Sequence, residues 1–149
     1  MKPVFAFVLL AIVLLSCASE DPQRVMDLLP EPVVSPDPPK DSQVLKMGDL
    51  TSYAHNLAGK SKVYVDDGDK KFLRFEDFTM TQGPDVYVFL STSNNYSKAN
   101  VIPLTKLTEG YSNAFLQFNI DPSIDLTIHK FVLVYCVQYN SLFGYAELK

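Results

Sequence analysis

The sequence FVLVYCVQYNSLFGYAEL, residues 131–148, contains a long apolar run, a short polar turn and a second apolar run. If the first run is a strand, alternate side chains point to opposite faces of a sheet. Apolar residues then occupy both faces, with Phe131, Leu133, Tyr135, Val137 and Tyr139 on one and Val132, Val134 and Cys136 on the other. A strand that is apolar on both faces is typical of the interior of a packed sheet.

Residues 46–149 have the pattern of a single β-domain. Short alternating runs are separated by turn residues, and no segment shows a sustained helical period. Residues 85–91 predict a second central strand, while Pro103 places the short run 101–104 at a sheet edge. In total we expect about eight strands, spaced as in an antiparallel β-sandwich of the immunoglobulin-like or jelly-roll-like kind. The predicted fold class is therefore all-β.

The turn Asp66-Asp-Gly-Asp69 interrupts this pattern between two predicted strands. It is predicted to form a hairpin turn, in which Gly68 can adopt a positive φ. A calcium loop is the alternative, but no glutamate completes an EF-hand loop and no flanking helices are apparent. The two histidines and Cys136 also lack the spacing of a zinc site, so we expect no metal.

The N-terminus predicts a signal peptide over residues 1–16. Its apolar run, residues 4–15, is too short for a membrane-spanning helix of about 20 residues, but it suits the core of a signal peptide. The following Leu14-Leu-Ser-Cys17 resembles the lipobox of bacterial lipoproteins. This resemblance implies that Cys17 is acylated and binds membrane lipid, which places the protein in the cell envelope, outside the cytoplasm. The alternative is an ordinary secretory signal with a chance cysteine.

Residues 17–45 are predicted to be an extended, disordered tether. Six of the ten prolines lie here, together with six acidic residues against Arg24 and Lys40. Such a spacer could hold the domain several nanometres, at roughly 3 Å per residue, from the membrane. The remaining domain is nearly neutral and has no cluster of Lys or Arg, so we expect no nucleic-acid partner.

Cys136 is the main candidate for chemistry. If Cys17 is acylated, Cys136 has no intramolecular partner, and the chain has no GxSxG, CxxC, GxGxxG or P-loop sequence. A buried cysteine commonly acts as a small apolar residue, whereas a reactive thiol needs some exposure and a lowered pKa. His55 could supply a nearby positive charge. Gln138, on the same face of the predicted strand as Cys136, and Tyr135 beside it could mark a polar opening, so these three are candidates for the surroundings of the thiol.

Several motifs resemble the DM thirteen domain, the Skeletor-associated electron-transfer family. They are Gly48…His55…Gly59, Phe75-Glu-Asp-Phe78, Gly83-Pro-Asp-Val-Tyr-Val-Phe-Leu90, Phe131-Val-Leu-Val-Tyr-Cys136 and Leu142-Phe-Gly-Tyr-Ala-Glu-Leu148. The resemblance implies that Cys136 is a redox thiol or the attachment point of a cofactor, although no motif names that cofactor. The chain departs from the family pattern at Tyr135, where tryptophan is expected, and at Leu50, where phenylalanine is expected.

Two functions follow as hypotheses. The first is a membrane-anchored extracytoplasmic lipoprotein whose redox or electron-transfer domain is centred on Cys136 and serves an unknown redox or protein partner. The second is a non-catalytic β-sandwich that binds a ligand or mediates adhesion at the cell surface, in which Cys136 is only packing. The sequence contains no motif of an enzyme class that would decide between them.

Overall fold

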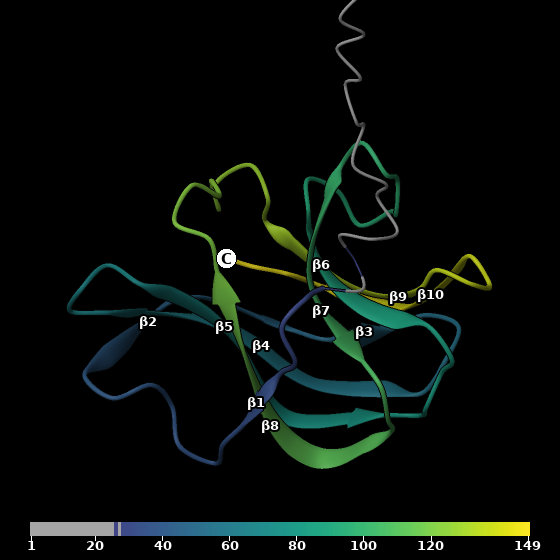
Figure 1. Ribbon diagram of the computed structural model, residues 1–149, viewed down its shortest axis with the longest axis horizontal. Helices are drawn as coiled ribbons and strands as arrows, with labels where there is room; N and C mark the ends of the chain where they lie inside the picture. The colour runs from purple at the N-terminus through teal and green to yellow at the C-terminus, as the bar shows by residue number, and fades with distance from the viewer. Residues whose placement is uncertain (1–25, 27) are drawn as a thin grey trace, which may run out of the picture.

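The computed structural model describes Met26 and residues 28–149, which form ten strands in two five-stranded antiparallel sheets (Figure 1). Sheet A has the strand order β1-β8-β5-β4-β2, and sheet B has the order β3-β10-β9-β6-β7. The strands are β1 (Val33–Val34), β2 (Ser42–Asp49), β3 (Thr51–Ser52), β4 (Leu57–Asp66), β5 (Lys71–Met80), β6 (Val86–Ser91), β7 (Val101–Leu107), β8 (Tyr111–Ile120), β9 (Phe131–Cys136) and β10 (Ser141–Glu147). The prediction of an all-β antiparallel sandwich is confirmed.

The main hydrophobic core lies between the two sheets, because alternate side chains of the central strands point inward. Aromatic rings fill the sheet A side: the ring centroid of Phe75 lies 4.8 Å from that of Phe78 and 5.1 Å from that of Phe118. Sheet B contributes smaller side chains from its two central strands, namely Val86, Val88, Leu90, Val132, Val134 and Cys136. The structure confirms that residues 86–91 form a central strand and that the strand containing Pro103 lies at an edge.

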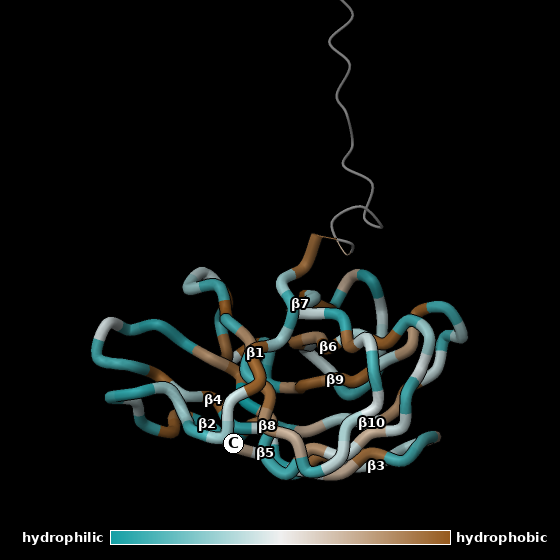
Figure 2. Tube along the Cα trace, turned by 60° about the horizontal axis from the view of Figure 1, so that its bottom comes forward, coloured by the Kyte–Doolittle hydropathy of each residue, from teal (hydrophilic) through white to brown (hydrophobic). Residues whose placement is uncertain are grey.

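A second apolar cluster covers the outer face of sheet B. It consists of Tyr87, Phe89, Leu133 and Tyr135, all buried, and we call it the outer cluster. Met26, Leu29 and Tyr96 pack against it. In Figure 2, β9 and the segment that begins the described chain are both coloured as hydrophobic. β6 and β9 are therefore buried on both faces, as their apolar pattern predicted.

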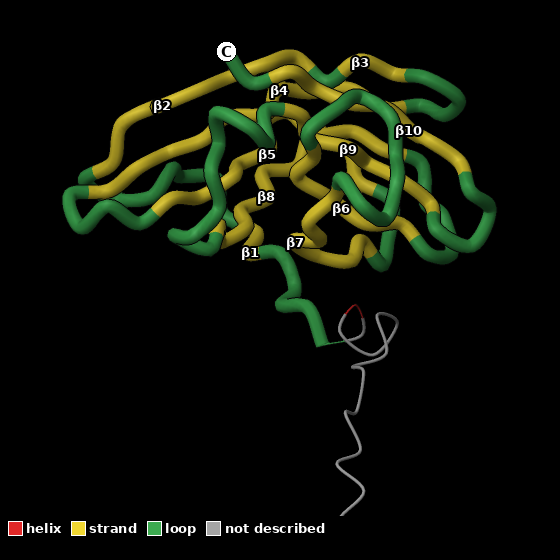
Figure 3. Tube along the Cα trace, turned by 90° about the horizontal axis from the view of Figure 1, so that it is seen from above, coloured by secondary structure: helices red, strands yellow, loops and turns green. Residues whose placement is uncertain are grey.

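Met26 and residues 28–36, which we call the strap, lie against the domain. Met26 and Leu29 pack on the outer cluster of sheet B. The Thr105 hydroxyl on β7 donates a hydrogen bond of 2.6 Å to the Pro30 carbonyl, and β1 pairs with β8 at the edge of sheet A. β1 and β7 lie close together in Figure 3, so the strap crosses from one sheet to the other at this edge.

The sequence predicted a disordered spacer through residue 45, and the structure differs over residues 28–45. Val33–Val34 form a strand, and β2 begins at Ser42. A two-residue strand is too short to show a period, and its partner β8 is distant in sequence, so composition alone could not reveal it. The predicted signal peptide and Cys17 lie outside the described residues. Within the described part, no helix has the length and apolar character needed to cross a membrane.

Arg74 fixes the second half of the strap. Its guanidinium, with a side chain only 1% exposed, donates hydrogen bonds through Nη2 to the carbonyls of Ser35 at 2.9 Å and Pro36 at 2.8 Å. The same group lies 5.3 Å from the centroid of the Phe115 ring. Hydrogen bonds from a charged donor contribute more to stability than neutral ones do. Arg74 is therefore the main polar clamp on the strap.

We expect Arg74→Met to release the strap. The substitution keeps much of the apolar volume but removes both hydrogen bonds, so the free energy of unfolding should fall by roughly 1–3 kcal/mol. Hydrogen exchange measured by mass spectrometry should show a larger increase over wild type in residues 28–36 than in β9. Lys70→Met, at an exposed position, is the matched control, and equal exchange in the two variants would contradict the clamp.

Glu76 lies on β5, two residues after Arg74, and contacts the polar side chains around it. Its carboxylate accepts a hydrogen bond from the Tyr64 hydroxyl at 2.9 Å and lies 2.5 Å from Lys62 Nζ and 3.4 Å from Arg74 Nε. Burial alone raises the pKa of Glu76, but the hydrogen bonds from Lys62 and Tyr64 outweigh burial and hold the pKa below its ordinary value. The ionised carboxylate is therefore part of the folded state.

The lowered pKa of Glu76 means that its contribution to stability is lost at acidic pH. Because the folded state binds the Glu76 proton less tightly than the unfolded chain, the stabilisation is complete above the ordinary pKa of 4.5 and is lost as the pH falls through the lower, folded value. We expect Glu76→Gln to flatten the decline of the unfolding free energy in this acidic window. Urea titrations at several pH values measure it, with Glu109→Gln, at an exposed position, as control. Equal pH profiles for wild type and Glu76→Gln would contradict the assignment.

The hairpin turn after β4 forms as predicted but with a different residue in the left-handed region. Asp69 has φ of 59°, whereas Gly68 does not have a positive φ. The Asp66 carboxylate accepts hydrogen bonds from the backbone N–H groups of Gly68 and Lys70, both at 2.9 Å. Aspartate tolerates the left-handed conformation better than most residues do, which explains why a glycine was not needed there.

Candidate functional site

Cys136 is the last residue of β9 and lies at one end of the core. In the strand register it is opposite Val86 on β6 and Ser141 on β10. Its side chain belongs to the core between the sheets and is 1% exposed, and it is the free cysteine of the described residues. The thiol is therefore shielded from solvent in this conformation.

Two neighbouring residues close this end of the core. The register between β9 and β10 shifts at Phe143, so this extra residue turns its buried side chain into the core. A Cβ atom added to Gly83 would stand 2.5 Å from Val86 Cγ2 and 3.0 Å from Phe143 Cζ. The turn containing Gly83 therefore packs against Phe143 and against Val86, the residue opposite Cys136. It leaves no room for an added side chain at position 83.

His55 completes this closure from the loop between β3 and β4. Its half-buried ring stacks on Phe143, with ring centroids 4.0 Å apart and planes inclined by 25°. His55 Nε2 and Ser141 Oγ are 2.9 Å apart and form a hydrogen bond. We call Gly83, His55 and Phe143 the thiol cap. The fold therefore brings His55 to the residue that is paired with Cys136, although the two are far apart in sequence.

Tyr135 faces the opposite side of sheet B from Cys136. Its ring, 5% exposed, belongs to the outer cluster and stacks on the Tyr96 ring, with centroids 4.0 Å apart and planes inclined by 9°. Its hydroxyl donates a hydrogen bond to Asn140 Oδ1. Burial raises the pKa of Tyr135, and the nearby Tyr96 and Cys136 raise it further. Tyr135 therefore stays a neutral phenol and does not open a path to the thiol.

The expectation that Gln138 continues the face of Cys136 is wrong. β9 ends at Cys136, and residues 137–140 form a turn in which Asn140 has φ of 49°. The Gln138 side chain is exposed in this turn. Strand alternation does not continue through a turn. Because Val137 and Tyr139 are apolar, the hydrophobic pattern of the sequence did not show that the strand ends before them.

The comparisons with known proteins identify the family. The family model described as "Electron transfer DM13" matches residues 49–148. The chain belongs to the DM13 electron-transfer family. No curated protein and no solved structure matches the chain. The matched DM13 domain contains Cys136 and the whole thiol cap, whereas the strap and nearly all of β2 precede it.

The sequence did not indicate two residues of this candidate site. Ser141 had no signal, because a serine in a polar turn has an ordinary structural explanation. Phe143 belongs to the family motif at the chain end, but its role depends on the register shift in β10, which periodicity does not show. Within the described residues, no group of three or more His, Cys, Asp or Glu side chains is arranged to hold a metal ion.

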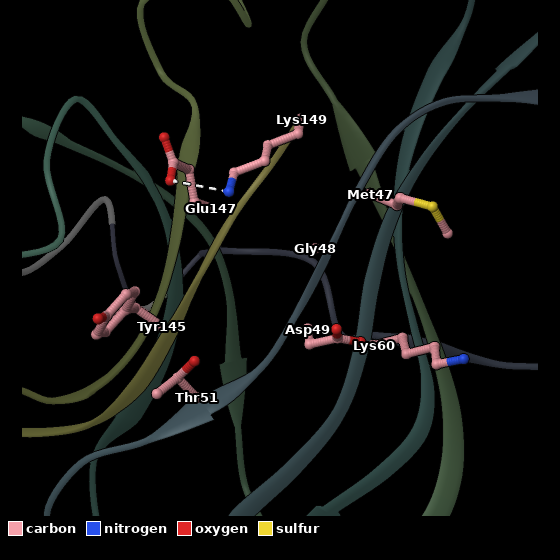
Figure 4. A pocket seen from close by; sticks show the side chains of 8 residues that line it. All are labelled: Met47, Gly48, Asp49, Thr51, Lys60, Tyr145, Glu147 and Lys149. Atoms are coloured by element: carbon pink, nitrogen blue, oxygen red, sulfur yellow. Dashed lines mark ion pairs between the residues drawn. The ribbon is translucent and has the colours of Figure 1, made fainter.

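An open groove lies at the other edge of the DM13 sandwich, where β2 approaches β10 (Figure 4). Its volume is about 580 Å³, and the lining residues are Met47, Gly48, Asp49, Thr51, Lys60, Tyr145, Glu147 and Lys149. Figure 4 shows Tyr145 and Thr51 on one side and Asp49 on the other. Lys149 Nζ lies 3.8 Å from Glu147 Oε2, so part of its charge is already paired. The groove is shallow and mixed in polarity, and it lacks the enclosed apolar surface of a small-molecule pocket.

Proposed function

We propose that the DM13 domain is a redox module whose reactive group is the Cys136 thiol, reached when the thiol cap opens. The observation that carries this proposal is the half-buried hydrogen bond between His55 and Ser141, across the strand pair from Cys136. The thiol otherwise lies among valines. A polar pair with a titratable ring at this place is what a thiol that exchanges protons requires.

The chemistry follows from the thiolate being the nucleophile. When the cap opens, the imidazole of His55 can accept the thiol proton through the Ser141 hydroxyl. The thiolate can then attack a disulfide: a bond forms between Cys136 Sγ and one sulfur of the substrate, the substrate S–S bond breaks, and the second sulfur leaves as a thiolate.

We propose a bare thiol rather than a cofactor attachment point. Gly83 has no room for one added methyl group beside Val86 and Phe143, so this end of the core is filled by the protein itself. A covalently bound prosthetic group at Cys136 would need both the thiol cap and β10 to move. A free thiol needs only a local opening of the cap.

Exchange with glutathione disulfide tests the redox proposal. Native protein equilibrated with glutathione buffers of increasing oxidation should form a mixed disulfide at Cys136, detected by peptide mass spectrometry. His55→Gln should form it more slowly, because the glutamine amide can still hydrogen-bond to Ser141 but cannot accept the thiol proton. If Cys136 remains reduced in every buffer until the protein unfolds, the thiol is packing and the redox proposal fails.

We also propose that Cys17 is acylated and anchors the protein in the cell envelope, facing away from the cytoplasm. The lipobox sequence supports this proposal. Because the strap packs against the domain from Met26, the chain between Cys17 and the domain spans at most about 30 Å, which is shorter than the predicted spacer. Mass spectrometry of membrane-extracted protein tests the anchor, and a Cys17→Ala variant that remains equally membrane-bound would contradict it.

The binding hypothesis has one observation in its favour, the groove between β2 and β10. Its open shape and paired charges suit a weak contact with an extended polar ligand better than a deep site. Chemical-shift mapping with candidate surface glycans or peptides tests this alternative. Shifts confined to groove residues such as Thr51 and Tyr145, in a protein whose Cys136 does not react, would favour binding over redox chemistry.

A further inference from the structure

We propose that Tyr96 and Tyr135 form an electron exit that connects Cys136 with the surface of sheet B. This inference rests on the proposed redox role of Cys136 and extends it to one-electron chemistry. The thiol cap lies on the inner side of β9 and does not include Tyr96 or Tyr135. They lie on the outer side of the same strand, where the protein offers a second route to the same residue.

The geometry places three oxidisable groups in series. Cys136 and Tyr135 are consecutive residues, with Cα atoms about 3.8 Å apart, and their side chains point to opposite faces of sheet B. The Tyr135 ring then lies parallel to the Tyr96 ring, with centroids 4.0 Å apart. Tyr96 is half-buried and so reaches the surface. A thiol and two phenols thus lead from the core to solvent.

The loop 92–100 holds Tyr96 in place. Asn100 Nδ2 donates hydrogen bonds to Ser93 Oγ at 2.8 Å and to the Asn95 carbonyl at 3.1 Å, and the Ser97 N–H donates to Asn100 Oδ1 at 2.9 Å. Tyr96 is the one aromatic residue of this polar loop. A loop fixed by its own polar side chains therefore places a single phenol against Tyr135.

Apolar and aromatic neighbours surround the stacked pair. The Phe89 ring meets Tyr96 edge to face, with centroids 5.3 Å apart, and Met26 and Leu29 of the strap pack on the same outer cluster. The Tyr135 hydroxyl keeps one polar partner, the side chain of Asn140 in the exposed 137–140 turn. The buried phenol therefore has its hydroxyl directed toward the solvent side of the domain.

One electron and one proton leave the protein by this route. A one-electron oxidant at the surface takes an electron from Tyr96, whose phenolic proton passes to water. Tyr135 then reduces the Tyr96 radical and releases its own phenolic proton to water, while Tyr96 recovers a proton from water. Cys136 reduces the Tyr135 radical in turn: the thiol proton passes through Ser141 and His55 to water, and Tyr135 recovers a proton from water. In sum, the oxidant gains one electron, water gains one proton, and the thiol of Cys136 becomes a thiyl radical.

Photo-oxidation of the full chain tests this route without a physiological partner. A ruthenium tris-bipyridine photo-oxidant with persulfate would be flashed in the presence of a nitrone spin trap, and adducts would be located by peptide mass spectrometry. In wild type we expect adducts at Cys136. Tyr96→Phe and Tyr135→Phe should each give a severalfold loss of the Cys136 adduct, and the double variant should fall to the background of Cys136→Ala.

The control is Tyr111→Phe, which changes a half-buried tyrosine that packs on Phe78 in the core between the sheets. It should leave the Cys136 adduct unchanged, and circular dichroism would confirm that all variants are folded. An undiminished Cys136 adduct in the Tyr96 and Tyr135 variants overturns the electron exit. Tyrosyl radicals in wild type that live as long as those in Cys136→Ala, with no Cys136 adduct, overturn it as well. Neither result affects the exchange with glutathione disulfide, which tests the thiol separately.

Discussion

Replacing Phe143 by alanine is expected to lower the free energy of unfolding by about 3–5 kcal/mol, the range for deleting a buried phenylalanine. The side chain fills the end of the core and supports the stacked His55 ring. Its loss leaves a cavity at the end of the core where Cys136 lies. We therefore also expect faster reaction of the thiol with a small reagent, by more than the loss of global stability alone produces.

The matched control for Phe143→Ala is Phe118→Ala. Phe118 lies in the same core but pairs with Leu73, in the half of β8 that leads away from Tyr111. It should cost a similar free energy of unfolding without favouring the opening of the thiol cap. Urea titration gives the stabilities, and labelling under native conditions gives the rates. If both variants react equally fast at equal stability, Phe143 has no specific role in gating the thiol.

Replacing Gly144 by alanine is expected to destabilise the domain by about 1–3 kcal/mol or more, as overpacking of a filled site does. An added Cβ would stand 2.2 Å from the Thr51 carbonyl oxygen and 2.5 Å from Leu57 Cδ2. The Thr51 carbonyl belongs to β3, which pairs with β10, so it cannot move without disturbing the pairing. Thermal unfolding measures the effect.

Gly68→Ala provides the comparison for Gly144→Ala. At Gly68 an added Cβ meets only Asp66 Oδ1, at 3.3 Å, and the side chain of an exposed turn can adjust. We expect a change within about 0.5 kcal/mol, as for most surface substitutions. Similar losses in the two variants would mean that the close approach between β3 and β10 does not limit the residue at position 144.

The sequence predicted the central strands of the fold well, because burial on both faces produces a continuous apolar run. β6 and β9 are such runs, and Pro103 correctly indicated an edge strand. The strap was missed because its contacts are few and distant in sequence. Arg74 binds carbonyls 38 and 39 residues away, and no local pattern encodes that pairing.

The candidate site was predictable only in part. Cys136 was a candidate because of its chemistry and the family motif, and the structure places His55 beside its strand neighbour Ser141. The position of Gln138 was wrong because the end of β9 is set by the turn at Asn140. The closure by Phe143 depends on one register shift, and the stacking of Tyr96 on Tyr135 depends on the fold of a polar loop. Neither is visible in a linear sequence.

The reaction rate of Cys136 with a thiol reagent in native wild-type protein, measured against increasing urea below the unfolding transition, shows whether the thiol cap opens without global unfolding. At low urea the reaction rate of Cys136 should exceed the rate that global unfolding allows. Because opening of the thiol cap exposes little surface, this rate should also depend only weakly on urea. A rate that follows global unfolding at every urea concentration would contradict the account. In that case Cys136 is a core residue, and the proposed redox role loses its reactive group.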